Sequence, residues 1–162
     1  MEQREKVFRK LDELNILYEV INHPAAFTIE ELNTLGFDAH DDVAKNLFLR
    51  DDRGKNHYLV VVQKDKKVDL KKLREQLGST KLGFASEERL WKYLQLTKGA
   101  VTPLGVINDS TCSVVVVFDK DLVNRQRIGV HPNENTSTVF LSFNDLKRVI
   151  ESNGNKIIYA DV

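Results

Sequence analysis

Cysteine is nearly absent from this chain of 162 residues, which contains only Cys112. A single cysteine cannot form an internal disulfide, and it excludes a zinc site built from several thiolates. Because Cys112 precedes the apolar run 114–118, we expect a buried, unreactive thiol rather than a nucleophile. The chain also lacks the run of about 18 apolar residues that a membrane span needs. Its first residues are charged rather than apolar, so we see no signal peptide and expect a cytoplasmic protein.

An excess of charge of either sign is absent as well. Lys and Arg together number 24, as do Asp and Glu, and the isoelectric point is about 6.9. Proteins that bind nucleic acid through bulk electrostatics usually carry a basic domain, so we do not expect a DNA-binding protein. A local patch could still contact an RNA backbone, and the lysines of 64–67 and 71–72 are the candidates. Such a cluster is more often a solvated face.

The length fits one domain over residues 1–162, and no linker or repeat interrupts the chain. Helical spacing and capping residues predict helices over 3–14, from Thr28, and over 69–77, 86–94 and 143–152. Apolar runs rich in β-formers predict strands over 16–21, 46–50, 58–63, 105–107, 113–118, 127–130, 138–142 and 156–160. Helices and strands do not alternate regularly. The pattern therefore favours an α+β fold with a mixed, mainly antiparallel sheet and helices packed around it.

Lys45 and Asn46 open an apolar strand. A lysine at a strand edge that faces a cleft could hold a phosphate or a carbonyl oxygen, because it is a compact charge with three donors. A lone lysine in this position is more often solvated. The residues alone leave both interpretations of Lys45 open.

The segment from Gly99 to Pro103 combines a glycine and a proline at fixed separation. Glycine lets the backbone approach a ligand closely, and proline fixes the shape of the loop. Free N–H groups in such a loop can stabilise a developing oxyanion. An ordinary turn is the alternative interpretation.

His131 precedes Pro132 in a dense polar turn. With an ordinary pKa near ~6.5 it could act as a general base, but no acidic partner at a fixed spacing is visible, so we favour a binding role. The four histidines lie far apart in sequence, and no pair has ligand spacing. The chain has no zinc motif, no P-loop and no serine nucleophile elbow, and we expect neither a metal nor a cofactor.

In this order and at these distances, the segments 44–49, 99–103 and 129–136 resemble the YbaK/ProX family of aminoacyl-tRNA editing domains. The resemblance covers nearly the whole chain. It implies an α+β fold, a catalytic role for Lys45, and a second set of residues that bind substrate. These are Asn46, Gly99, Ala100, Val101, Thr102, Pro103, His131, Phe27 and Thr28.

The resemblance further implies a hydrolase that removes alanine from mischarged tRNA for proline, acting in trans to the synthetase. An aminoacyl ester is activated, so a positioned water and a stabilised oxyanion could suffice without a metal. The implied partners are the acceptor end of aminoacylated tRNA and prolyl-tRNA synthetase. Two alternatives stay open: a deacylase for cysteine on the same tRNA, and a non-catalytic module that binds tRNA or a synthetase.

Overall fold

The structure of the chain, a computed structural model, describes residues 2–24 and 43–162. The helix expected from Thr28, and Phe27 beside it, lie outside the described residues. The helices are α1 (Gln3–Glu13), α4 (Leu70–Leu77), α5 (Glu87–Leu94), α6 (Phe143–Asn153) and the short 3-10 helices η1 (Pro103–Asn108) and η2 (Lys120–Leu122). The strands are β1 (Glu19–Asn22), β2 (Ala44–Arg50), β3 (His57–Gln63), β4 (Gly83–Phe84), β5 (Val114–Asp119), β6 (Ile128–Val130), β7 (Ser137–Leu141) and β8 (Ile157–Ala160).

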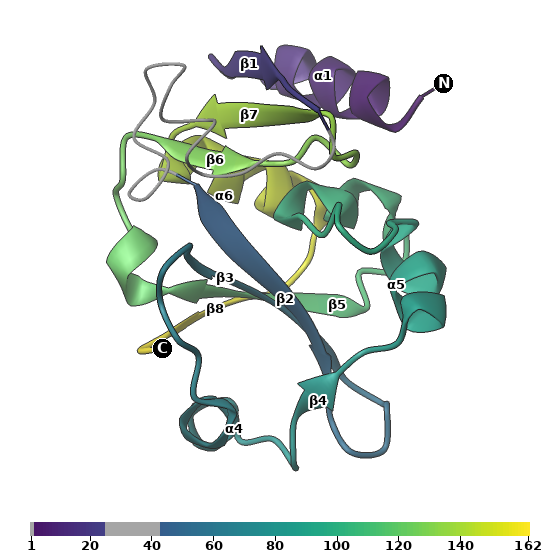
Figure 1. Cartoon of the computed structure of the whole chain (residues 1–162), viewed down its shortest axis with the longest axis vertical. Helices are drawn as coiled ribbons and strands as arrows, with labels where there is room; N and C mark the ends of the chain where they lie inside the picture. The colour runs from purple at the N-terminus through teal and green to yellow at the C-terminus, as the bar shows by residue number, and fades with distance from the viewer. Residues whose placement is uncertain (1, 25–42) are drawn as a thin grey trace.

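The strands form two sheets, with helices packed around them (Figure 1). The five-stranded sheet has the order β4-β2-β3-β5-β8, and the three-stranded sheet has the order β1-β7-β6. The β3–β5 and β5–β8 pairs are parallel, and the other pairs are antiparallel. An isolated bridge between Val43 and Gly129 connects the sheets. The α+β class with a mixed, mainly antiparallel sheet is confirmed, and the division into two sheets is an addition to it.

The hairpin β2–β3 forms as its turn chemistry predicts. The Asp51 carboxylate accepts from the Lys55 amide at 2.8 Å and from the Asn56 side chain at 2.8 Å. Gly54 adopts φ 68°, a left-handed conformation that favours glycine. The turn sets the register in which Ala44 pairs with Gln63 and Arg50 with His57.

The five-stranded sheet is covered on both faces, so β3 is buried from His57 to Val62. One face packs against apolar residues of α1, α5, η1 and α6, and the other against Leu73 of α4 and its neighbours. The predicted caps position two of these helices. Asp69 accepts from the Lys71 and Lys72 amides at the start of α4, and Ser86 accepts from the Arg89 amide at the start of α5.

The strand expected over 105–107 is wrong, because these residues belong to the 3-10 helix η1. The Thr102 hydroxyl accepts from the Leu104 amide, and Pro103 occupies the first helical position, which is typical of a helix start. Gly105 packs so closely that an added Cβ would lie 2.6 Å from Leu96 Cδ1. The apolar run is therefore buried as a helical turn rather than as a sheet strand.

Two smaller expectations also change. The strand expected from 16 begins only at Glu19, because Asn15 at φ 57° and the bond from the Ile16 amide to the Leu11 carbonyl first end α1. Cys112 is half-buried rather than buried, and its thiol donates to the Asn153 carbonyl at 3.1 Å. No helix in the described ranges 2–24 and 43–162 is long and apolar enough to cross a bilayer.

Candidate functional site

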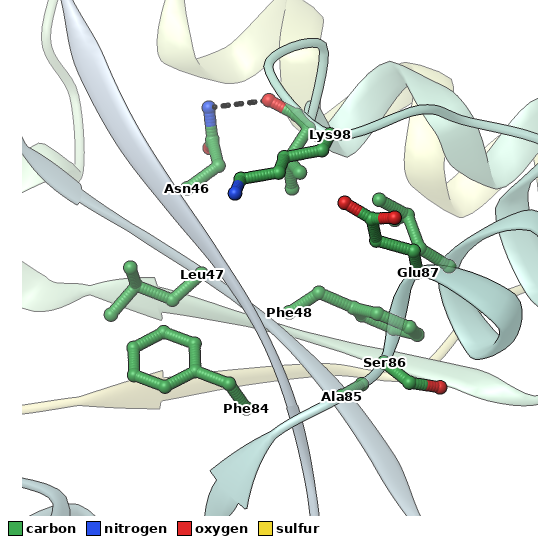
Figure 2. Close-up of a pocket in the computed structure, with 10 residues that line it drawn as sticks. Asn46, Leu47, Phe48, Phe84, Ala85, Ser86, Glu87 and Lys98 are labelled. Carbon is green, nitrogen blue, oxygen red and sulfur yellow. Dashed lines mark hydrogen bonds between the residues drawn. The ribbon is translucent and has the colours of Figure 1, made fainter.

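The three sequence motifs, far apart in the chain, are joined by side-chain hydrogen bonds. Asn46 Nδ2 on β2 donates to the Val101 carbonyl at 3.2 Å, the contact dashed in Figure 2. The buried Thr102 hydroxyl donates to the His131 carbonyl at 2.6 Å. Loop 99–103 therefore lies between β2 and the polar turn after β6, and it fixes the position of each against the other.

A cavity of about 370 Å³ lies where β2, the start of α5 and loop 97–101 meet. Its lining is mainly apolar, with polar groups at the rim, as is usual for a small-molecule site. Figure 2 shows the charged ends of Lys98 and Glu87 directed over the cavity, with Phe84 beside Leu47. The lining consists of Asn46, Leu47, Phe48, Phe84, Ala85, Ser86, Glu87, Leu90, Lys98 and Val101.

Asn46, which lines this cavity, has an unsatisfied buried acceptor. Because its Nδ2 donates to a carbonyl, the amide orientation is fixed and Oδ1 is the free end. That oxygen is buried and has no hydrogen-bond partner among the described residues. An unpaired buried acceptor costs about 1–3 kcal/mol, which a ligand with an N–H or O–H donor would recover. Asn46 is therefore a candidate ligand contact.

Lys45 lies on the opposite face of β2 and is not part of the cavity lining. Its ammonium donates to the Lys66 carbonyl, in the segment after β3. The Lys66 side chain is itself held by Asp119 at 2.7 Å and Asp121 at 2.8 Å, and Asp119 is fully buried. Lys66 is thus a structural ion-pair partner rather than the solvated charge that its cluster suggested. Lys45 therefore binds a backbone carbonyl of a residue that two ion pairs hold in place.

Most residues of loop 99–103 are buried or hydrogen-bonded within the protein. Ala100, Thr102 and Pro103 are buried, and the Ala100 amide donates to the Thr97 carbonyl at 3.1 Å, closing a turn. Gly99 adopts φ 94°, which a residue with a side chain rarely reaches. The amides of Gly99 and Val101 have no hydrogen-bond partner within the part of the chain that the structure describes. These two amides, and not that of Ala100, are the candidates for holding a developing oxyanion.

His131 is positioned outside the cavity, beside a second histidine. Its Nδ1 lies 3.0 Å from the Ser137 carbonyl, so Nδ1 carries the proton and Nε2 is an acceptor. Burial lowers the pKa of His131, which keeps the ring neutral near pH 7. The ring centroid of His23 lies 6.2 Å away, and His23 Nε2 lies 2.8 Å from the Thr138 hydroxyl. Pairing of β1 with β7 brings the two histidines together, although sequence spacing gave no sign of it.

Glu134 shapes the turn that follows His131. Its carboxylate accepts from the Thr136 amide at 2.6 Å, and also from the hydroxyls of Thr136 and Ser137. Burial acts to raise the pKa of Glu134, but these hydrogen bonds outweigh burial and lower it. Sequence reasoning missed this acidic residue because it acts on the backbone of the turn rather than on the imidazole.

Sequence reasoning also missed Phe84, Glu87 and Lys98 at the cavity. Their signals were weak: the Ser86 cap places Glu87 at the start of α5, and Lys98 directly precedes Gly99. No group of three His, Cys, Asp or Glu side chains could hold a metal ion among residues 2–24 and 43–162.

Comparisons with known proteins bear on the family and the fold of this chain. A family model described as an aminoacyl-tRNA editing domain matches residues 23–149. The chain is 55% identical to the prolyl-tRNA editing protein ProX of Acetoanaerobium sticklandii, over 96% of this chain and 94% of that protein. It is 34% identical to a mouse protein named prolyl-tRNA synthetase associated domain-containing protein 1, over 94% of this chain and 92% of that protein.

Among solved structures, a protein described as a candidate trans-editing enzyme for prolyl tRNA synthetase superposes with a TM-score of 0.74. It covers 98% of this chain and 96% of its own, with 19% identity, and so supports the fold alone. The family model and the sequence relatives carry the assignment. The chain belongs to the family of aminoacyl-tRNA editing domains, and it is an enzyme of that family, an aminoacyl-tRNA deacylase.

Proposed function

We propose that this protein is a trans-editing deacylase that hydrolyses mischarged tRNA for proline, with alanine as the preferred amino acid. The observation that carries the proposal is the 55% identity to the prolyl-tRNA editing protein ProX across almost the full length of both chains. The mouse relative's name mentions prolyl-tRNA synthetase, which supports that synthetase as a partner.

The cavity chemistry supports an ester hydrolase that needs little activation of its substrate. In an aminoacyl-tRNA the ester carbonyl lies next to a ribose hydroxyl and an α-amino group, both of them donors. The free Asn46 Oδ1 accepts one of these donors, which holds the ester next to loop 99–103. The Val101 or Gly99 amide then stabilises the negative charge that develops on the carbonyl oxygen as water attacks.

His131 acts in this proposal as a neutral acceptor. Its Nε2 lone pair orients the attacking water or the ribose hydroxyl, because Nδ1 is already committed to Ser137. The lowered pKa of His131 keeps that lone pair available at neutral pH. The Thr102 bond to the His131 carbonyl ties the position of the imidazole to loop 99–103.

Lys45 anchors the substrate by charge. When the tRNA end is present, its ammonium leaves the Lys66 carbonyl and reaches round the edge of β2, where Leu47 of the same face already lines the cavity, to bind the terminal phosphate or the ester carbonyl. Lysine suits this exchange because its four-carbon stem is flexible and its charge is compact.

Specificity rests on size. The family resemblance implies that Phe27 and Thr28, which lie outside the described residues, contact the substrate, and we expect the amino-acid pocket to admit a methyl group but exclude the pyrrolidine ring. Cysteine adds one sulfur atom to alanine, and a single heavy atom in an apolar pocket discriminates by only ~1–3 kcal/mol. Discrimination against cysteine is therefore weaker than discrimination against proline.

The test is deacylation of one tRNA for proline charged with alanine, with cysteine or with proline. We expect alanine to be released fastest, cysteine more slowly and proline negligibly. A faster rate on the cysteine ester would assign the protein to cysteine editing. No hydrolysis of any ester, with tRNA binding retained, would make it a binding module instead.

A further inference from the structure

Two large aromatic side chains are exposed on neighbouring elements, β4 and α5. Phe84 on β4 is 64% exposed, and Trp91 on α5 is 56% exposed. Aromatic residues usually bury most of their surface, so exposed rings mark contact sites more often than exposed aliphatic residues do. Helix α5 packs Leu90 and Leu94 into the core and leaves Trp91 outside. Neither aromatic ring belongs to the hydrophobic core.

The two rings flank one continuous groove. Phe84 lines the cavity that contains Asn46, and Trp91 lines an adjoining hollow of about 270 Å³ with Leu96 and Thr97. The two hollows share Glu87 and Lys98, the residues whose charged ends lie over the cavity in Figure 2. We call this surface, from Phe84 past Glu87 and Lys98 to Trp91, the aromatic groove.

The groove offers three kinds of contact at once. Its two aromatic faces can stack against planar rings, and the Lys98 ammonium can bind an anion such as a phosphate. The Glu87 carboxylate accepts from exocyclic amino groups, as acidic residues do with cytosine N4. A basic surface that binds the phosphates of a nucleic-acid duplex would not carry a carboxylate at its centre. This combination suits unpaired nucleotides whose bases carry amino groups.

We propose that the aromatic groove binds the unpaired 3′-terminal nucleotides of tRNA, C-C-A, with Phe84 and Trp91 as stacking platforms. The inference rests on the proposed function, because it takes aminoacylated tRNA as the substrate. The esterified adenosine occupies the Asn46 end, where the ester must lie, and the two cytidines extend towards Trp91. Stacking supplies affinity that a chain with 24 basic and 24 acidic residues does not gain from net charge.

Binding of uncharged oligonucleotide tests the groove directly. Trp91 is the only tryptophan in the chain, so intrinsic tryptophan fluorescence reports on this surface alone. We expect the trinucleotide CCA to quench it in a saturable way, and UUU, which has no amino group, to bind more weakly. Phe84→Ala should weaken CCA binding about tenfold, and Glu87→Gln should reduce the preference for CCA over UUU. No quenching by CCA at millimolar concentration would overturn the proposal.

Kinetics separate the groove from the reactive site. We expect Trp91→Ala to lower kcat/KM on alanyl-tRNA about tenfold relative to its value on 3′-O-alanyl-adenosine, mainly through KM, because the small ester lacks cytidines. Leu17→Ala is the matched control, since Leu17 is 88% exposed and lies outside the groove. Leu17→Ala should leave kcat/KM unchanged on both alanyl-tRNA and 3′-O-alanyl-adenosine.

The outcomes distinguish this inference from the proposed function. If the wild-type protein hydrolyses alanyl-tRNA and Trp91→Ala matches it on both substrates, the groove proposal is wrong and the deacylase stands. If Trp91→Ala loses both activities equally, Trp91 serves the reactive site or the fold and the proposal is also wrong. If the wild-type protein hydrolyses neither ester, the deacylase fails, while CCA quenching still decides the groove.

Discussion

Strands β2 and β3 have equal length and pair along their whole span, but they differ in what surrounds them. β3 lies between β2 and β5 and is buried from His57 to Val62. β2 is buried only at Ala44, Phe48 and Leu49, because β4 pairs with no more than its last two residues. Among residues 2–24 and 43–162, no strand pairs with Lys45 to Leu47 on the side away from β3, so we call this part of β2 the open edge. Lys45 and Asn46 can lie there because neither needs to be enclosed on all sides.

The largest expected effect is on catalysis at the open edge. We expect Lys45→Ala to lower kcat/KM on alanyl-tRNA by about 100- to 1000-fold, as loss of a group that stabilises transition-state charge does. The melting temperature should change little, since the Lys45 ammonium contributes one hydrogen bond, to the Lys66 carbonyl. Single-turnover deacylation and thermal unfolding measure the two. Near-wild-type rates would remove Lys45 from the mechanism.

The central strand should respond in the opposite way. Leu59 in β3 is fully buried, so Leu59→Ala should lower the free energy of unfolding by about 3 kcal/mol through lost burial and a residual cavity. Urea denaturation measures this change. The rate per folded molecule should be unchanged below the unfolding transition, and a selective loss of rate would extend the site into β3.

Asn46→Ala sharpens the contrast within β2. The change removes one hydrogen bond and also removes a buried oxygen that has no partner among the described residues, so the net effect on stability should be within about 1 kcal/mol. Activity should fall about tenfold, because a ligand donor loses its acceptor. Urea denaturation measures the change in stability, and deacylation of alanyl-tRNA measures the change in activity. A stability loss comparable with that of Leu59→Ala would make Asn46 a structural residue.

Gly99→Val tests the loop that faces the open edge. At φ 94° a valine is strained by about 1–2 kcal/mol, while an added Cβ would approach only Asn135 Nδ2, at 3.6 Å. We expect activity to fall by more than this strain accounts for, because the side chain crowds the tRNA end. Equal losses of activity and stability would indicate an ordinary turn.

The smallest effect concerns pH. Burial lowers the pKa of His57 on β3 and of His131, so both bind protons more weakly when folded than when unfolded. Their contribution to stability is complete above pH ~6.5 and is lost as pH falls from there through the folded-state pKa values. Urea midpoints between pH 8 and 5 should show this decline, and His131→Asn should make it shallower. Urea midpoints that do not change with pH would contradict the prediction that both histidines are neutral in the folded protein.

The fold could be predicted where the signals are local. The Asp69 and Ser86 caps, the turn at 51–56 and the apolar spacing of α6 placed those elements within a residue or two. The run 105–107 favours a strand in the sequence because a short apolar segment has the same pattern in a buried strand as in a buried helical turn. The Thr102 cap with Pro103 was the signal that distinguished them. The parallel β3–β5 pair joins distant segments, and no local residue marks it.

The site was predictable in part for the same reason. The family resemblance singled out Asn46 and Val101, and the structure joins them by a hydrogen bond, while their role in binding substrate stays a prediction. It could not show that Lys45 points to the Lys66 carbonyl, since that depends on the face of β2 and on the path of a separate segment. Nor could it pair His23 with His131, because it takes the β1–β7 and β6–β7 ladders together to bring them close.

That ladder has a consequence for how the chain is made. Glu19 pairs with Phe140 and Asn22 with Ser137, so β1 finds its partner only after most of the chain has been synthesised. Until then Leu11 and Ile16, which are buried in the finished core, have no complete surface to pack against. Folding that depends on such distant contacts is slow, on the order of milliseconds to seconds. On the ribosome, the neighbourhood of His23 and His131 is therefore among the last parts of the molecule to assemble.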